Sequence, residues 1–210
     1  MSDIDIIKET QDWLVLDKGA GISVHNRDGE DLVSFIRSAY PDLPKAFPIN
    51  RLDAGTMGLV LFAKNAQAAK FLQQSFEQRR VKKTYLARVE ILKNPPEAGD
   101  EGLWRWPLTN RAEGRRDPKG FWKRRIPCQT KWKVQGVHEG VGDLEIELLT
   151  GRKHQIRRHG AIYGWPILGD PRYGPKEGTS AHGSLIAKSL VFTDPASQAE
   201  VEVTSRFNLS

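Results

Sequence analysis

Hydrophobic and polar residues alternate along much of this chain with the period of two that is typical of half-buried β-strands. Other apolar runs are short and continuous, contain β-branched and aromatic residues, and end at turn residues, as strands buried on both faces do. The strands predicted in these two ways are 12–18, 22–24, 59–64, 84–91, 104–108, 130–134, 144–148, 185–195 and 201–207. A glycine-rich turn over 136–142 predicts that the strands on either side of it form an antiparallel pair.

Helical spacing of apolar residues occurs in two other segments. Segment 30–39 begins with acidic residues, which suit the positive end of the helix dipole. Segment 65–80 begins with Asn65, a typical N-cap residue, and its C-terminal end is strongly basic. We therefore expect one α+β domain over 1–210, with a mixed, mostly antiparallel sheet, flanking helices and a central cleft.

Composition excludes several classes of protein. The chain has 210 residues, of which 39% are hydrophobic and 28% charged, and no apolar run approaches the length of a membrane-spanning helix. Cys128 is the only cysteine, so an internal disulfide is impossible and a cysteine metal site is not expected. The acidic N-terminus lacks the pattern of a secretory signal. We expect a cytoplasmic protein that does not enter a membrane, with a monomer as the default state.

Positive charge points to an anionic partner. The net charge is +6 and the isoelectric point is about 9.5, which favours a nucleic acid or a membrane surface. Segment 111–125 is rich in arginine and lysine and contains Phe121 and Trp122. Basic residues interleaved with aromatic residues can follow a phosphate chain and stack on unpaired bases, although a solvated loop has the same composition. We expect RNA as the partner, with Trp122 and Arg124 in contact with it.

One carboxylate stands out in the loop over 50–58, which leads into the predicted buried strand 59–64. Asp53 follows Arg51 and precedes two glycines, which allow a tight turn or a close approach of a ligand to the backbone. A lone aspartate in such a loop is more often a turn or cap residue than a catalytic one. Local chemistry alone leaves both interpretations open.

A second unusual segment covers 150–159 and predicts a turn that opens a basic helix. It contains two histidines, His154 and His159. They are not one helical turn apart and no acidic residue is nearby, so we do not expect a metal site here.

These two segments, together with the predicted strand 84–91 and the lysine before it, resemble three motifs of the RluA family of RNA pseudouridine synthases. The matching residues are Arg51-Leu52-Asp53 with Thr56 and Gly58, then Lys83, Tyr85 and Ala87, then Thr150-Gly151-Arg152 and His154-Gln155-Ile156-Arg157 with His159. The resemblance extends from about residue 13 to residue 207, and we see no appended S4 domain. It implies the pseudouridine synthase fold and an isomerase that converts a uridine of tRNA or rRNA to pseudouridine without a metal or cofactor. Lys153 and Arg158 in the third motif favour the branch that acts on tRNA.

The resemblance also implies roles for individual residues. Asp53 would be the catalytic carboxylate, acting either as a nucleophile or as a base. Arg157 would pair with it and keep it ionised, and Tyr85 would stack against the flipped-out uracil. Arg51 would fill the space that the uracil leaves in the RNA.

Three further residues of the third motif are assigned to substrate binding by the same resemblance. Ile156 would line the base pocket, and Arg152 and His154 would contact the RNA.

Several positions depart from the family pattern and raise an alternative function. They are Asn50 and Ile186, where the family has histidine, Met57, where it has serine, and Asp194. The alternative is a non-catalytic RNA-binding or RNA-folding protein that keeps the synthase fold. The joint presence of Asp53, Tyr85 and Arg157 favours the enzyme. A nuclease is not expected, because the sequence has no acidic cluster for two metal ions.

Overall fold

The computed structural model describes residues 4–25, 31–43, 45–110, 118–121, 124–175 and 183–209. The chain forms two compact units. Unit 1 comprises Met1–Lys83 and Ile186–Asn208, and unit 2 comprises Thr84–Leu185 and Leu209–Ser210. The grouping of both units into a single catalytic domain stays a prediction.

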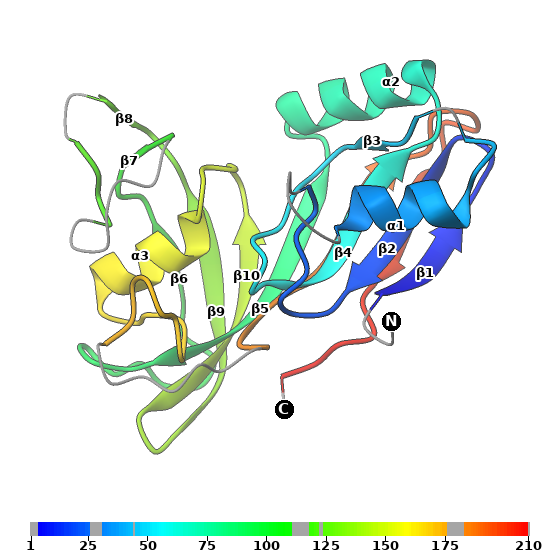
Figure 1. The fold of residues 1–210 in the computed structure, drawn as a ribbon. Helices are drawn as coiled ribbons and strands as arrows, with labels where there is room; N and C mark the ends of the chain where they lie inside the picture. Colours follow the sequence, from blue (N-terminus) through cyan, green and yellow to red (C-terminus); the bar gives the residue numbers. More distant parts are fainter. Residues whose placement is uncertain are drawn as a thin grey trace. The chain divides into compact units, whose positions relative to one another are not determined.

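Unit 1 is built on a mixed sheet (Figure 1). Its strands lie in the order β1 (Ile4–Glu9), β2 (Trp13–Lys18), β4 (Met57–Ala63), β11 (Leu185–Thr193) and β12 (Glu200–Thr204), and β3 (Phe47–Pro48) also pairs with β4. β4 and β11 are parallel, whereas the other pairs are antiparallel. The sequence did not predict β1, an edge strand that is mostly exposed, or the two-residue β3, because neither has a clear apolar pattern.

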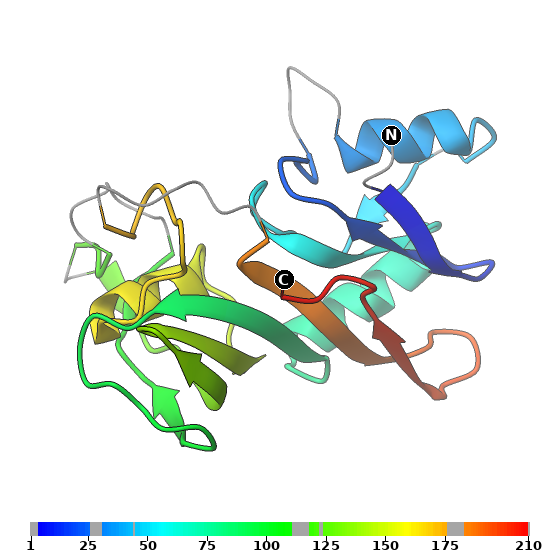
Figure 2. The same cartoon turned by 90° about the horizontal axis from the view of Figure 1, so that it is seen from below.

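Two helices cover opposite faces of this sheet, α1 (Leu32–Ala39) and α2 (Ala66–Glu77) (Figure 2). Alternate residues of β2 enter different clusters: Trp13 packs in the same cluster as Leu72 of α2, whereas Leu14 packs with Leu32 and Ile36 of α1. All residues of β2 are therefore buried, which explains its continuous apolar pattern.

The helix ends match the sequence only in part. Asn65 caps α2 as predicted, its side chain accepting a hydrogen bond from the amide of Ala68 at 2.9 Å. The helix ends at Glu77 rather than near residue 80, because Arg79 adopts a left-handed φ of 58°. The predicted basic C-terminal turn of this helix is thus wrong, and its arginines lie in the turn that leads to the next strand.

Two further details of unit 1 differ from the predictions. Asp31 is the N-cap of α1, accepting a hydrogen bond from the Ser34 amide at 2.7 Å, and the first turn of the helix has no acidic residue. Segment 22–24 is not a strand, since Ser23 makes only an isolated bridge with Asp31. Val24 in this segment is buried against α1, so its apolar character reflects burial and not strand pairing.

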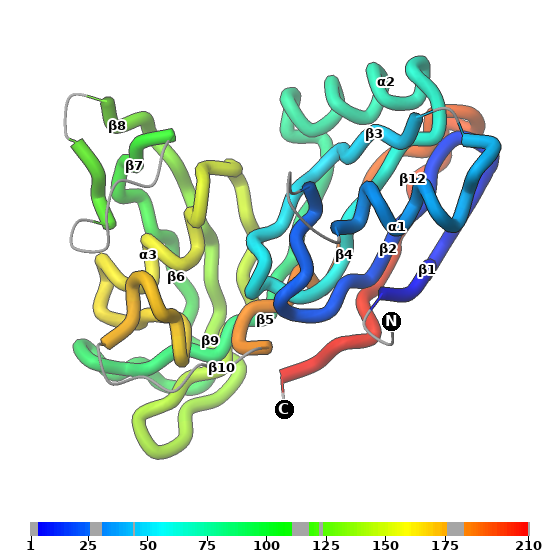
Figure 3. Tube along the Cα trace, viewed as in Figure 1, coloured from blue at the N-terminus to red at the C-terminus, as the bar shows by residue number. Residues whose placement is uncertain are grey.

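The C-terminal segment of unit 1 is fastened to β2 (Figure 3). The fully buried carboxylate of Asp17 accepts hydrogen bonds from the Ser205 hydroxyl and the Arg206 amide, both at 2.8 Å. Burial raises the pKa of Asp17, although these hydrogen bonds oppose the shift. Lys188 of β11 donates to the carbonyl oxygens of Ser205 and Phe207 at 2.7 and 2.8 Å, which fixes the same segment from a second strand.

Unit 2 contains an antiparallel sheet in the order β5 (Lys82–Glu90), β10 (Val141–Leu148), β9 (Thr130–His138) and β6 (Glu101–Trp104). Helix α3 (Gln155–Tyr163) and a two-stranded pair, β7 (Leu108–Thr109) and β8 (Arg125–Ile126), complete it. The predicted pairing of β9 with β10 is confirmed. The turn is shorter than predicted, because Glu139 and Gly140 both adopt positive φ angles of 49° and 79° and close it tightly.

Aromatic rings form much of the interior of unit 2. The ring of Trp104 lies 5.7 Å from Tyr163, 6.0 Å from Trp165 and 6.1 Å from Trp132, measured between centroids. A Cβ atom at Gly102 would lie 2.4 Å from the Trp132 ring, so glycine is required for this packing. The α+β class and the mixed, mostly antiparallel sheet are confirmed, whereas the central cleft stays a prediction.

Candidate active site

The loop that carries Asp53 connects β3 to β4 in unit 1. The amide of Thr56 donates to the carbonyl oxygen of Asp53 at 3.0 Å and closes a turn. The turn thus uses the backbone of Asp53, so a turn role and a chemical role for its side chain are compatible. The Asp53 side chain is half-buried, and Arg51, two residues earlier, is exposed.

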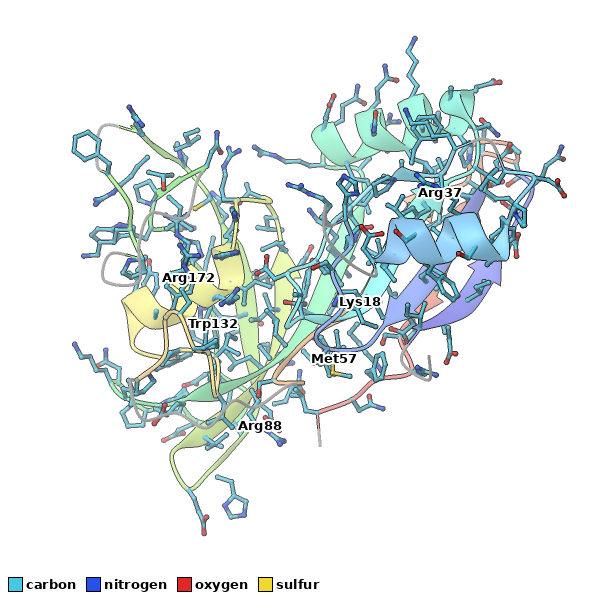
Figure 4. All side chains as sticks on the ribbon, in the orientation of Figure 1. Lys18, Arg37, Met57, Arg88, Trp132 and Arg172 are labelled. Carbon is cyan, nitrogen blue, oxygen red and sulfur yellow. The ribbon has the colours of Figure 1, made fainter. Side chains whose placement is uncertain are left out.

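A buried lysine holds this loop from inside. Lys18, the last residue of β2, is fully buried and donates hydrogen bonds to the carbonyl oxygens of Gly19 and Ala54 at 3.1 Å and to that of Thr56. Burial lowers the pKa of Lys18 to about 8, and the negative charge of Asp53 opposes the shift. Figure 4 shows Lys18 close to Met57, which is the first residue of the neighbouring strand β4.

The sequence analysis placed Lys18 only at the end of the predicted strand 12–18, whereas in the structure its ammonium is the cation that holds the Asp53 loop. An apolar strand pattern gives no signal for such a role. Only the presence of a lysine in a continuous buried run could have raised the question, because lysine is rarely fully buried.

Asn50 supports the same loop from its other end. Its amide nitrogen donates to the carbonyl oxygen of Leu59 at 3.1 Å, and its side-chain oxygen accepts from the amide of Leu61 at 2.8 Å. These two bonds continue the pairing of β3 with β4 through a side chain. Asn50 therefore has a structural role in this chain, because it connects the loop to the sheet.

Two other departures from the family pattern are neighbours in the sheet. Met57 of β4 pairs with Ile186 of β11 in the parallel register, and Gly58 pairs with Ala187. An apolar pair thus stands where the family has serine and histidine. Gly58 is required at this crossing, since its φ is +106° and a Cβ atom would lie 2.3 Å from the Ala187 carbonyl oxygen.

In unit 2, Gln155 organises the turn before α3. Its side-chain nitrogen donates to the carbonyl oxygen of Gln129 at 2.9 Å and to the hydroxyl of Thr130 at 2.8 Å. Its side-chain oxygen accepts from the hydroxyl of Thr150 at 2.8 Å and from the amide of Arg152 at 3.0 Å. These four hydrogen bonds of one buried side-chain amide connect the start of α3 to the turn before it and to the residues at the start of β9.

His154 and Arg152 were predicted to bind substrate. His154 occupies the N-cap position of α3 with a left-handed φ of 55°, and its Nδ1 atom lies 3.0 Å from the Tyr173 hydroxyl. Arg152 is half-buried and donates from Nη1 to the side chain of Asn110 at 3.3 Å. Both side chains thus contact other residues of unit 2.

Arg157 makes a bidentate pair within unit 2 that the sequence interpretation missed. Its Nε and Nη2 atoms donate to the two carboxylate oxygens of Asp170 at 2.8 and 2.9 Å. Burial opposes ionisation of Asp170, but Arg157 and the amides of Arg172 and Tyr173 outweigh it and hold the pKa of Asp170 below its usual range. Because Asp53 belongs to unit 1, its pairing with Arg157 stays a prediction.

The remaining predicted site residues differ in exposure. Tyr85 lies on β5 opposite Ile146 of β10 and is 8% exposed, and Ile156 in the first turn of α3 is 5% exposed. Arg124 is exposed. Trp122 lies outside the described residues.

His159 has a structural role in unit 2. Its Nε2 atom lies 2.9 Å from the Trp106 carbonyl oxygen, and its Nδ1 atom lies 2.9 Å from the Thr130 hydroxyl. Burial lowers the pKa of His159 to about 4, with the nearby charge of Arg158 acting in the same direction. The imidazole is therefore neutral at pH 7.

Across the described ranges, no group of three or more His, Cys, Asp or Glu side chains is placed to hold a metal ion. In the same part of the chain, every helix is too short or too polar to cross a membrane.

The family model for RNA pseudouridylate synthases matches residues 12–161. A human structure entitled RNA Pseudouridylate Synthase Domain Containing 1 superposes with a TM-score of 0.78 at 24% identity, over 97% of this chain and 83% of the other. The fold is thus that of the pseudouridylate synthases, as predicted.

Sequence relatives identify the family. An uncharacterized RNA pseudouridine synthase of Chloroflexus aurantiacus is 34% identical over 172 residues, which are 76% of this chain and 51% of that protein. The chain thus spans about half the length of that relative. The dual-specificity RNA pseudouridine synthase RluA of Escherichia coli is 31% identical over 195 residues, 91% of this chain and 87% of that protein. This chain belongs to the RluA family of RNA pseudouridine synthases, isomerases that convert uridine in RNA to pseudouridine.

Proposed function

We propose that this chain acts in the cytoplasm as a monomer, converts a specific uridine of tRNA or rRNA to pseudouridine, and uses Asp53 as its catalytic carboxylate. The observation that carries this proposal is the loop of Asp53, whose backbone is held by the buried ammonium of Lys18 through the carbonyl oxygens of Ala54 and Thr56. A carboxylate on a preorganised loop keeps its aim during a reaction without further ordering. The E. coli relative is named a dual-specificity RNA pseudouridine synthase, which supports a uridine in RNA as the substrate.

The reaction breaks the bond between N1 of uracil and C1′ of ribose and forms a bond from C5 to C1′. The proton on C5 leaves and N1 gains one, so the product is an isomer and no electrons are exchanged. In our proposal Asp53 acts at C1′ as a nucleophile or removes a proton from the ribose as a base. Arg157 stabilises the ionised carboxylate, while Tyr85 and Ile156 contact the uracil ring.

Asp53→Asn tests this proposal directly. It keeps the size of the side chain but removes its charge, so pseudouridine formation in unmodified tRNA and rRNA transcripts should fall at least about a hundredfold. RNA affinity should stay unchanged. Asp42→Asn is the matched control, since it neutralises an exposed carboxylate of unit 1 and should retain full activity.

The outcomes of this assay separate the two functions. Activity that survives Asp53→Asn would remove this residue from the mechanism. A wild-type protein that binds the transcripts and forms no pseudouridine in any of them would support the non-catalytic alternative.

A second variant tests the proposed role of Arg51 in holding the RNA open. A uridine stacked in RNA must be flipped out at a cost of about a few kcal/mol, and a planar guanidinium can stack in its place. Arg51 is exposed, so Arg51→Ala should leave the unfolding midpoint unchanged and lower kcat/KM on structured RNA. Arg51→Lys should fail to rescue the loss, because an ammonium does not stack. Equal rates for wild type and Arg51→Ala would contradict this role.

A further inference from the structure

A short turn in unit 2, residues 118–121, has three successive carbonyl groups bound by two guanidinium groups. Arg158 donates from Nε to the carbonyl oxygen of Pro118 at 2.6 Å and from Nη2 to that of Lys119 at 3.2 Å. Arg125 donates from Nε and Nη2 to the carbonyl oxygen of Gly120 at 2.9 and 2.7 Å. Charge-assisted hydrogen bonds of this kind fix the backbone of the whole turn.

Arg158 connects this turn to β7 and α3, which lie near one another in Figure 1. Its side chain is fully buried, and it also donates to the carbonyl oxygen of Thr109 at 2.8 Å and to the Thr109 hydroxyl at 3.0 Å. Gly120 has a φ of +71°, and a Cβ atom there would lie 2.3 Å from the Thr109 hydroxyl oxygen. The turn is therefore packed against β7 as closely as its backbone allows. Arg158 has no surface through which it could contact RNA itself.

The side chains on and beside this turn have the chemistry of a nucleic-acid contact. The Phe121 side chain is 53% exposed, and Arg124 is exposed. The amide of Arg124 donates to the carbonyl oxygen of Phe121 at 3.0 Å, so the backbones of the two residues are hydrogen-bonded to each other. The Lys119 ammonium lies 4.3 Å from the centroid of the Trp106 ring.

We infer that Phe121 and Arg124 form a preorganised contact for one unpaired nucleotide of the RNA substrate, outside the target uridine, and that Arg158 and Arg125 are its positioning residues. This rests on the proposed function, because it takes the partner to be the substrate RNA. An aromatic ring stacks on any base, and a guanidinium pairs with the adjacent phosphate. A backbone that is ordered before binding lowers the entropy cost of the complex.

Direct contact is tested by the affinity of variants for a labelled oligouridylate and for unmodified tRNA transcripts. Phe121→Ala should raise the Kd at least about fivefold, since it removes one stacked base. Leu92→Ala is the matched control, because Leu92 is also 53% exposed and lies in unit 2 away from the turn in sequence; its Kd should equal that of wild type. Wild-type affinity in Phe121→Ala would overturn the contact.

The charge of Arg124 is tested by salt dependence. Arg124→Ala should reduce the slope of log Kd against log salt by about 0.7, the value for one phosphate contact to a single strand. Arg124→Lys keeps the charge and should keep the slope. An identical slope in wild type and Arg124→Ala would show that this arginine meets no phosphate.

The positioning role requires a readout that a general loss of stability would not change. Arg158→Gln should raise the Kd for the oligouridylate, but should add nothing in a Phe121→Ala/Arg124→Ala background, since it acts through those two side chains. Leu144→Ala destabilises the core of unit 2 and should leave the Kd unchanged at temperatures below its unfolding transition. Additive effects of Arg158→Gln and the double substitution would overturn the positioning role. If Arg158→Gln does not fold, Arg125→Gln takes its place in the same comparison with the Phe121→Ala/Arg124→Ala background. This variant releases only the Gly120 carbonyl.

Failure of this contact is distinguishable from failure of the proposed function. If wild type forms pseudouridine, and Phe121→Ala and Arg124→Ala both bind RNA with wild-type affinity, only the proposed contact is overturned. If wild type forms no pseudouridine in any transcript, while the two variants bind RNA more weakly than wild type, the proposed enzymatic function is overturned and the contact is retained.

Discussion

A buried ammonium close to a carboxylate is the most consequential arrangement at the residue scale. Lys18 is removed from water at the end of β2, which disfavours its charged form, and the carbonyl groups of Gly19 and of two residues in the Asp53 loop replace the lost water. The loop is thus held by a group whose protonation changes at a moderately alkaline pH.

This arrangement predicts opposite effects of alkaline pH on activity and stability. As the pH rises through about 8, Lys18 loses its proton, keeps fewer N–H donors for its three carbonyl partners and no longer attracts Asp53, so activity should fall. The ordinary pKa of lysine is 10.5, so between these values the unfolded chain binds more protons than the native one. The contribution of Lys18 to the free energy of unfolding should therefore rise with pH over the same range.

Both effects can be measured with the variant Lys18→Met as the reference. The activity profile of wild type should show an alkaline decline that the variant lacks, and urea unfolding should show a pH slope that disappears in the variant. An alkaline decline that persists unchanged in Lys18→Met would mean that another group causes it.

At the scale of elements, the parallel pair of β4 and β11 brings together segments more than a hundred residues apart in the sequence. Its register places Met57 beside Ile186 and Gly58 beside Ala187. The sequence predicted each strand from its apolar run. It could not predict the pairing, because a parallel ladder leaves no local turn signal.

Gly58→Ala should destabilise the protein strongly, because it combines a φ of +106° with a Cβ atom 2.3 Å from a backbone oxygen of Ala187. We expect the free energy of unfolding to fall by more than about 2 kcal/mol. Gly55→Ala is the control in the same loop, since a Cβ atom at Gly55 meets nothing within 4 Å. Equal losses in the two variants, measured by urea denaturation, would refute the close approach of β11 to Gly58.

At the scale of the whole molecule, the excess of positive charge is the property most relevant to an RNA partner. The net charge of +6 comes from 32 lysine and arginine residues against 26 acidic ones. Burial removes charges of both signs from the surface: Lys18 and Arg158 have no exposed surface, and Asp17, Asp31 and Asp170 are at most 5% exposed. Among these described residues the buried positive charges are offset by buried negative ones, so burial does not remove the positive excess.

Binding of unmodified tRNA transcripts should weaken steeply with salt. If the protein neutralises at least three phosphates, the slope of log affinity against log salt should be about −2 or steeper. Filter binding or fluorescence anisotropy over a series of salt concentrations measures it. A slope near zero would exclude a phosphate-dominated interface and with it the proposed RNA partner.

The sequence by itself determined the features that depend on local pattern: the alternating strands β9 and β10 with their antiparallel pairing, the Asn65 cap, and the family motifs around Asp53 and Arg157. Each of these features depends on residues that are close together in the sequence, so it can be recognised from a short stretch of the chain. The prediction of a basic end for α2 failed because one left-handed residue ended the helix early.

Only the tertiary structure decided which charged groups meet. Lys18 binds a loop 36 residues away, Arg157 pairs with Asp170, and Arg158 holds carbonyl groups some 40 residues earlier in the chain. Such partners carry no periodic signal, because the free energy of a buried charge depends on which acceptors folding brings to it and not on its sequence neighbours.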